Sequence, residues 1–232
     1  MALLLRPTNL RHLVVPAAMC LALVASTQAG SAAFVPAASH LPLSAVVVHP
    51  ADLPSDWSSQ PGGPSPTQAA DSAAFARCVG VTDTNPDVVG AAYSPIFSLG
   101  AETITSSVSR FRHAADVASD SAAIANPKAA SCLARIVRPH LVASLPSGAT
   151  LKKFSLQIVL GPGAGPSNLA ATTYVTATVT SAGAQTTVFD TTAIVTGNRV
   201  EAQVSFASLG NQVPARLQAG LIAKVAKRAM LA

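Results

Sequence analysis

The chain has 232 residues, of which 50% are hydrophobic and 11% are charged, and its formal net charge at pH 7 is +5. So small a charged fraction excludes a long disordered tail, and the length suits one globular domain behind a processed N-terminus. The densest basic group, Lys224, Lys227 and Arg228, lacks interleaved aromatic residues. We therefore expect no binding of nucleic acid.

The first 29 residues have the pattern of a secretory signal peptide. Arg6 and Arg11 precede an apolar run over residues 13–25, and small residues lead to a cleavage site after Ala29. The run is shorter than the ~20 apolar residues that a transmembrane helix needs, so we expect no stable membrane span after cleavage. The protein is therefore expected to be secreted or associated with the cell envelope.

The three cysteines have different expected fates. Cys20 lies in the predicted leader and is an alternative lipid-attachment site, but the bulky Met19 before it favours cleavage after Ala29 instead. Cys78 and Cys132 then remain in an oxidising compartment, where we expect them to form one disulfide. They are too far apart for a redox motif and too few for a zinc site.

Residues 30–66 are predicted to form a flexible N-terminal segment with one short edge strand. The strand is expected at the β-branched run Val46–Val48, which Pro50 ends. Trp57, the only tryptophan, follows a turn punctuated by proline and is expected to plug one end of a core. Residues 58–66, rich in proline and glycine, are typical of a loop.

The middle of the chain is predicted to be mainly helical. The expected elements are a helix over 67–79, an irregular connection over 81–99, a strand over 103–111, a helix over 113–125 and a helix over 126–145. Pro139 is expected to kink or restart the last helix, because proline lacks the amide donor that a helix interior requires.

Residues 151–206 alternate between apolar and polar side chains and predict four antiparallel strands joined by turns. An amphipathic helix over 214–230 follows, and we expect it to lie on the apolar face of this sheet. The residues expected beneath it are Phe154, Leu156, Val204 and Phe206. The predicted fold class is thus α+β, an antiparallel meander sheet covered by helices, with residues 67–232 as one domain.

No catalytic, cofactor or metal motif is evident, so we expect neither an enzyme nor a bound cofactor. The chain lacks a Gly-x-Ser-x-Gly sequence, and its histidines are scattered. The glycine-rich run at 161–165 joins two predicted strands instead of opening a helix, which excludes a dinucleotide fingerprint. A candidate ligand surface is the threonine-rich face of the meander with Tyr174, Thr176 and Thr178, together with Trp57; the alternative is a solvated sheet face.

Several short stretches carry a resemblance to known proteins. They are Ala51–Pro54 with Trp57, Ala74–Gly80, Tyr93–Pro95 with Phe97, Pro127–Ala129 leading to Cys132–Leu133, and Leu145–Ala149. They resemble actinobacterial exported proteins described as hypothetical or sensor-domain-containing. The arrangement is also similar to PsbP-like α/β sandwiches, including mycobacterial LpqN-type lipoproteins, and to the extracellular sensor domain of mycobacterial kinase H. The resemblance implies an exported PsbP-like α/β sandwich and supplies no catalytic residue.

Export, apolar composition and the missing catalytic motifs together predict a non-enzymatic binding or sensory module for a small apolar or cell-envelope ligand. The alternatives are a protein-interaction or wall-associated structural module and, with less support, a hydrolase. A deep apolar pocket favours the first function, an exposed flat patch the second, and converging Ser, His and Asp side chains the third.

Overall fold

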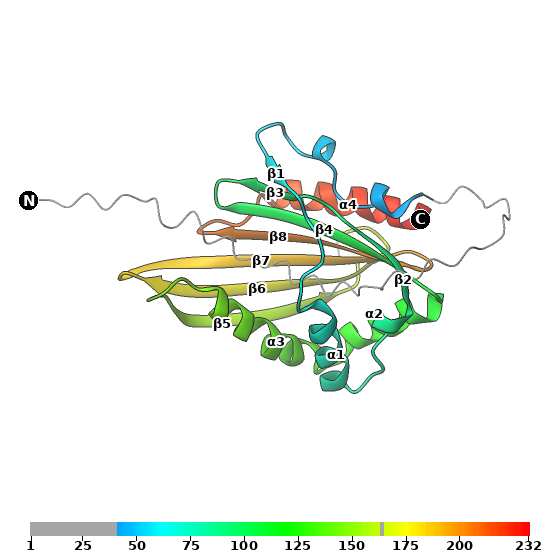
Figure 1. Cartoon of the computed structure of the whole chain (residues 1–232), viewed down its shortest axis with the longest axis horizontal. Helices are drawn as coiled ribbons and strands as arrows, with labels where there is room; N and C mark the ends of the chain where they lie inside the picture. Colours follow the sequence, from blue (N-terminus) through cyan, green and yellow to red (C-terminus); the bar gives the residue numbers. More distant parts are fainter. Residues whose placement is uncertain (1–40, 163–164) are drawn as a thin grey trace, which may run out of the picture.

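The computed structural model describes residues 41–162 and 165–232; the predicted signal peptide, with Cys20, and residues 30–40 of the lead-in lie outside the described residues. The described chain has an α+β fold in which one antiparallel eight-stranded sheet carries helices on both faces (Figure 1). The strands are β1 (Ser58–Gln60), β2 (Val88–Tyr93), β3 (Ile96–Leu99), β4 (Glu102–Phe111), β5 (Thr150–Leu160), β6 (Leu169–Ser181), β7 (Ala184–Thr196) and β8 (Val200–Leu209). The helices are α1 (Gln68–Val79), α2 (Ala114–Ala125), α3 (Ala129–Ser144) and α4 (Ala215–Leu231), with short 3-10 helices η2 (Leu43–Ala45), η3 (Pro50–Asp52) and η4 (Asn85–Asp87).

The strand order in the sheet is β1-β3-β4-β8-β7-β6-β5, and β2 pairs with β4 beside β3. The predicted meander β5–β8 is confirmed, and β8 extends the sheet by pairing with the predicted strand β4 along its length. The β6–β7 hairpin turns on Ala182 and Gly183, which both have positive φ. This is the geometry that a tight two-residue hairpin requires.

Helix α4 covers one face of the sheet, and α1, α2 and α3 lie on the other (Figure 1). On the α4 face, Leu221 and Val225 pack against Val204 and Phe206 of β8. The predicted contact of this helix with Phe154 and Leu156 is wrong, since those side chains pack on the opposite face. The pairing register of the strands gives the reason.

Cross-strand register decides which side chains share a face of the sheet. Leu156 of β5 stands opposite Val175, which stands opposite Asp190, and Asp190 stands opposite Ala207 of β8. Val204 is three residues from Ala207 and therefore points to the other face. Both faces of the sheet therefore carry helices, with α4 over β7 and β8 on one face, whereas the sequence predicts one covered face.

The face that carries α1–α3 holds three apolar clusters among the described residues; the smallest consists of Val88, Phe111 and Val117, and the other two involve α3. The first joins α1, α2 and the start of α3 to Ile194 of β7, and the disulfide Cys78–Cys132 lies at it, with a Cα–Cα distance of 5.7 Å. The predicted disulfide is therefore present. The second cluster gathers around Leu141 at the end of α3. Because α3 is anchored at both ends, its middle bridges the space between the two clusters.

The residues before β1 pack on the core and are part of the domain. Val46, Val47 and Val48 are buried against the α4-face core, but they form no strand, so the edge strand predicted there is wrong; the edge strand is β1 instead. Val48 donates its amide proton to the Ser106 hydroxyl at 2.7 Å. That side-chain bond takes the place of a ladder hydrogen bond.

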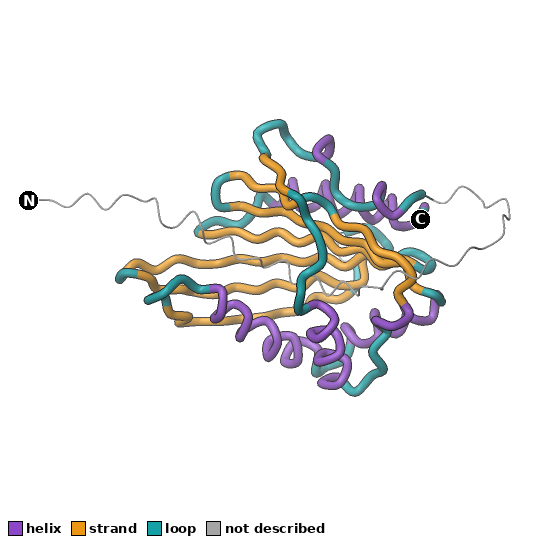
Figure 2. The backbone as a smooth tube through the Cα atoms, viewed as in Figure 1, coloured by secondary structure: helices purple, strands orange, loops and turns teal. Residues whose placement is uncertain are grey.

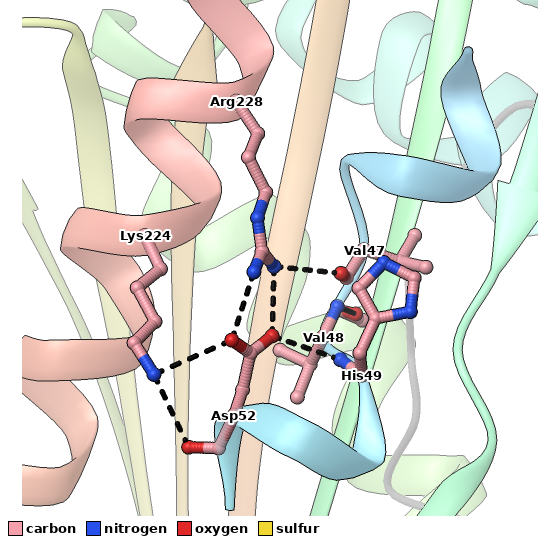
Figure 3. Close-up of polar contacts among 7 residues, drawn as sticks. Val47, Val48, His49, Asp52, Lys224 and Arg228 are labelled. Carbon is pink, nitrogen blue, oxygen red and sulfur yellow. Dashed lines mark hydrogen bonds and ion pairs between the residues drawn. The ribbon is translucent and has the colours of Figure 1, made fainter. Parts of the chain in front are cut away.

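A partly buried ion pair fixes this segment to α4 (Figure 3). Arg228 donates two hydrogen bonds to the Asp52 carboxylate, at 2.7 and 2.8 Å, and a third to the Val47 carbonyl at 3.1 Å. The His49 amide and Lys224 Nζ also contact this carboxylate. Burial by itself raises the pKa of Asp52, but the hydrogen bonds from Arg228 and His49 outweigh it and hold the pKa well below its ordinary value.

Two further expectations about the middle of the chain are corrected. The irregular connection predicted over residues 81–99 contains the strands β2 and β3; the small residues of β2, and Pro86 and Pro95 close to the strands, obscure the alternation that strands usually show. Helix α3 continues through Pro139 to Ser144 and neither ends nor restarts there. The other predicted helices and the strand over 103–111 are confirmed to within a few residues.

Candidate functional site

A cavity of about 600 Å³ lies between the middle of α3, the start of α1 and the sheet. The loop between β1 and α1 closes one side of it, and this loop runs across the sheet in Figure 2. At Gly62 the loop passes so close to the connection between β2 and β3 that an added Cβ would lie 2.0 Å from the Ser94 carbonyl oxygen. Only glycine permits that approach, so the sequence fixes the path of the loop over the cavity.

Most of the cavity wall is apolar. The α3 side is a stripe of residues at helical spacing, Leu133, Ile136, Val137, His140 and Leu141. Such a stripe normally fills the space against a sheet. Here Leu133 and Leu141 pack into the two clusters at the helix ends, and Ile136 packs against the edge of the first cluster, while Ile136 and Val137 also line the hollow. The hollow is therefore a consequence of how α3 is anchored.

The sheet side of the cavity is amphiphilic. Val175, Val188 and Ile194 are apolar, whereas Asp190, Thr192 and Gln203 add a polar strip on β7 and β8. The Thr192 hydroxyl shares a hydrogen bond of 2.9 Å with the Ser205 hydroxyl and donates at 3.3 Å to Asp190 Oδ1. Oδ2 of Asp190 is buried and has no hydrogen-bond partner. Burial raises the pKa of Asp190 to about 7, although the Thr192 hydrogen bond lowers it in part.

An ion pair spans the cavity wall between two helices. His140 Nε2 of α3 lies 3.0 Å from Asp71 Oδ1 of α1, and both side chains line the cavity. The two serine hydroxyls nearest in the lining have other partners: Ser144 donates to the Leu141 carbonyl, and Ser65 bonds to Thr67. A serine nucleophile activated by His140 is therefore not assembled among the described residues that line this cavity.

A smaller pocket of about 40 Å³ adjoins the large one behind Gln203. Two of its acidic side chains are Glu201, which is buried at 8% exposure, and Asp120, which is half-buried. Burial raises the pKa of both carboxyls, and the charge of Asp120 raises that of Glu201 further. Gln203 donates to Glu201, and Thr84 donates to Asp120. Both bonds favour the charged carboxylate and lower its pKa in part, but burial dominates, so the pocket is a cluster of hydrogen-bonded acids with raised pKa values.

The candidate ligand surface from the sequence lies elsewhere. Tyr174, Thr176 and Thr178 are on the face of β6 opposite the cavity, where Tyr174 is 41% exposed. Trp57 packs against the α4-face core, as expected for a core plug. None of the four lines the cavity, and their role as a ligand surface stays a prediction.

Sequence reasoning missed the cavity residues. Asp190 is nevertheless the only charged residue between Lys153 and Arg199, and this isolation was a usable signal. It alternates with Val188, Thr192 and Ile194 on one face of a strand, so a carboxyl had to point toward an otherwise apolar or hydroxyl-bearing layer. The open space itself depends on the distance between the middle of α3 and the sheet. No local sequence pattern encodes that distance.

Comparison with protein-family models and with curated proteins finds no match to this chain. Among residues 41–162 and 165–232, no helix is long and apolar enough to cross a membrane. Within the same ranges, no group of three or more His, Cys, Asp or Glu side chains could hold a metal ion. The cavity is thus the feature on which a functional argument can be built.

Proposed function

We propose that the protein is a non-enzymatic binding or sensory module for a small, largely apolar ligand. The cavity of about 600 Å³ between α3 and the sheet carries this proposal. Its volume falls within the range of roughly 300–1,000 Å³ that is usual for small-molecule sites, and its few polar groups are grouped on β7 and β8.

Leaving this apolar wall in contact with water costs free energy. Each Å² of apolar surface removed from water contributes roughly 25 cal/mol, so a ligand that fills the space gains that free energy from a wall already in place. Because the disulfide and the apolar clusters fix both ends of α3, little ordering is needed on binding.

Export to the cell envelope belongs to the same proposal. The predicted leader at 1–29 and the Cys78–Cys132 disulfide both suit an oxidising compartment, which favours a ligand derived from the envelope. A relationship to PsbP-like sandwiches and to sensor-domain-containing exported proteins agrees with an antiparallel sheet between helices. It remains part of the proposal.

A second candidate function is a protein-interaction or wall-associated module. The observation that favours it is the threonine face of β5 and β6, where Tyr174 and Val159 are 41% and 51% exposed. The side chains around those two are mostly polar, so this surface supports the alternative less strongly than the cavity supports ligand binding.

The test is a fluorescence titration with N-phenyl-1-naphthylamine, an uncharged apolar probe, on the wild type and on two variants of α3. Val137→Trp places a large side chain in the cavity and should weaken probe binding roughly tenfold or more, equivalent to ~1.4 kcal/mol or more. Val142→Trp is the matched control, because Val142 is 49% exposed on the same helix and lies outside the lining. Equal affinities of the two variants would remove the support for binding in this cavity.

A further inference from the structure

We propose that the ligand of this cavity is a cationic amphiphile, an apolar body with a primary ammonium head that pairs with Asp190. The inference rests on the proposed function, because it assigns the head-group chemistry of the same cavity. It is carried by the charges of the cavity and by the hydrogen bonding of its one isolated carboxyl.

The charges that line the cavity are unbalanced. Asp71 and Asp190 are acidic, His140 is the one basic side chain among the described lining residues, and these residues include no lysine or arginine. His140 is already joined to Asp71 at 3.0 Å. Asp190 therefore faces the cavity without a cationic partner in the described chain. An anionic head group such as a fatty-acid carboxylate would meet like charge in a poorly hydrated space.

The Asp190 carboxyl also has an open hydrogen-bonding position. Oδ1 accepts from the Thr192 hydroxyl at 3.3 Å, whereas buried Oδ2 accepts from no group in the described chain. A buried carboxyl oxygen without a partner costs free energy, so a structure retains one where a ligand or proton satisfies it. An ammonium group supplies both a donor and the missing countercharge.

The apolar side chains around Asp190 indicate which ligand shape the cavity would accommodate. Val188 and Ile194 flank Asp190 and Thr192 along β7, and Ile136 and Val137 of α3 lie across the space. A head group held at Asp190 therefore has apolar wall on both sides along the strand. This arrangement suits an alkyl or aryl amine. A strongly polar, extended ligand such as an oligosaccharide would lose its hydration against the apolar wall.

The protonation of Asp190 supplies a second, independent readout. Because burial raises its pKa to about 7, the carboxyl is about half protonated at pH 7 in the free protein. Pairing with an ammonium lowers that pKa, so binding should release about half a proton at pH 7. The other titratable groups near it are Asp71 and His140, which are paired with each other, and Glu201 behind Gln203.

The experiment compares three probes of equal chain length, octylamine, 1-octanol and octanoate, in competition with N-phenyl-1-naphthylamine at pH 7. We expect octylamine to bind about tenfold more tightly than 1-octanol and about a hundredfold more tightly than octanoate. Asp190→Asn should weaken octylamine binding at least about tenfold and leave 1-octanol within about twofold. Asp71→Asn is the control for general electrostatics and should retain the preference for the amine. Calorimetry in phosphate and in Tris should detect the released proton for the wild type and not for Asp190→Asn.

Two results would overturn the inference while leaving the proposed function intact. One is binding of octanoate as tight as octylamine. The other is unchanged octylamine affinity in Asp190→Asn, with N-phenyl-1-naphthylamine still bound. If no probe binds the folded wild type, the proposed function itself fails, and the head-group inference fails with it.

Discussion

Replacing Asp52 by asparagine tests how the N-terminal segment is held on the domain. The carboxylate accepts two hydrogen bonds from Arg228 at 2.7 and 2.8 Å and lies 3.3 Å from Lys224 Nζ. Its side chain is 6% exposed, that of Arg228 26% and that of Lys224 49%. Most of the loss therefore comes from Arg228, which would keep its charge with one fewer anionic partner.

We expect Asp52→Asn to lower the free energy of unfolding by about 3 kcal/mol, at the lower end of what breaking a buried pair costs, because Arg228 retains some solvent. For a domain of this size that corresponds to roughly 6–12 °C in Tm. Urea denaturation followed by the fluorescence of Trp57, the only tryptophan, measures it directly. Asp56→Asn, at an exposed position four residues away, is the matched control and should change stability by less than about 0.5 kcal/mol.

The pH dependence of this difference provides a separate check. The native pKa of Asp52 is lowered, so its stabilisation is fully present above the ordinary value of 3.8 and is lost as pH falls through the native value. The gap between wild type and Asp52→Asn should therefore shrink between about pH 4 and pH 2. A gap below about 1 kcal/mol at pH 7, or one that is constant with pH, would refute the assigned role of the pair.

Three other predictions concern stability. Leu221→Asp puts a charge at a side chain that is 1% exposed and should unfold the domain, whereas Met230→Asp on the same helix, at 64% exposure, should leave the thermal transition nearly unchanged. Peptide mapping without reduction should recover Cys78 linked to Cys132, and reduction should cost about 4 kcal/mol for a loop of 54 residues; free thiols at both positions would contradict it. The native pKa of Asp190 is raised from 3.8 to about 7, so the free energy of unfolding of the wild type should fall relative to that of Asp190→Asn as pH rises from 4 to 7, by up to about 4 kcal/mol. Parallel curves of unfolding free energy against pH for the two proteins would contradict the burial of this carboxyl.

Local pattern was sufficient for the elements that carry their own signal. The alternation of apolar and polar residues predicts the strands β5–β8, and the amphipathic stripe predicts the helix α4, each close to its observed bounds. The two cysteines outside the predicted leader predict the one disulfide. Strands β2 and β3 were missed because Gly90, Ala91 and Ala92 give no alternation, and pairing with β4 supplies the order that their side chains lack. The β-branched run Val46–Val48 predicts a strand because such residues favour one. In the structure these residues belong to a loop whose side chains pack on the core.

The site was less accessible to prediction because it depends on long-range geometry. The threonine face of β6 drew attention by composition, while the cavity formed on the opposite face from residues of α3 and β7 that are ordinary in isolation. Register determines that Asp190 shares its face with Val175 and Leu156. Whether α3 then fills or bridges that face depends on its two anchored ends, which are distant in sequence from β7.

Isoleucine methyl NMR measures occupancy of the cavity most directly. The chain has seven isoleucines, of which Ile96, Ile124, Ile136 and Ile194 line the cavity, while Ile104 and Ile222 pack on the α4 face. On titration with N-phenyl-1-naphthylamine, the δ1 methyl signals of the four lining residues should shift together and saturate, and those of Ile104 and Ile222 should stay in place. Shifts confined to the α4-face residues, or no shift at any isoleucine, would contradict ligand binding between α3 and the sheet.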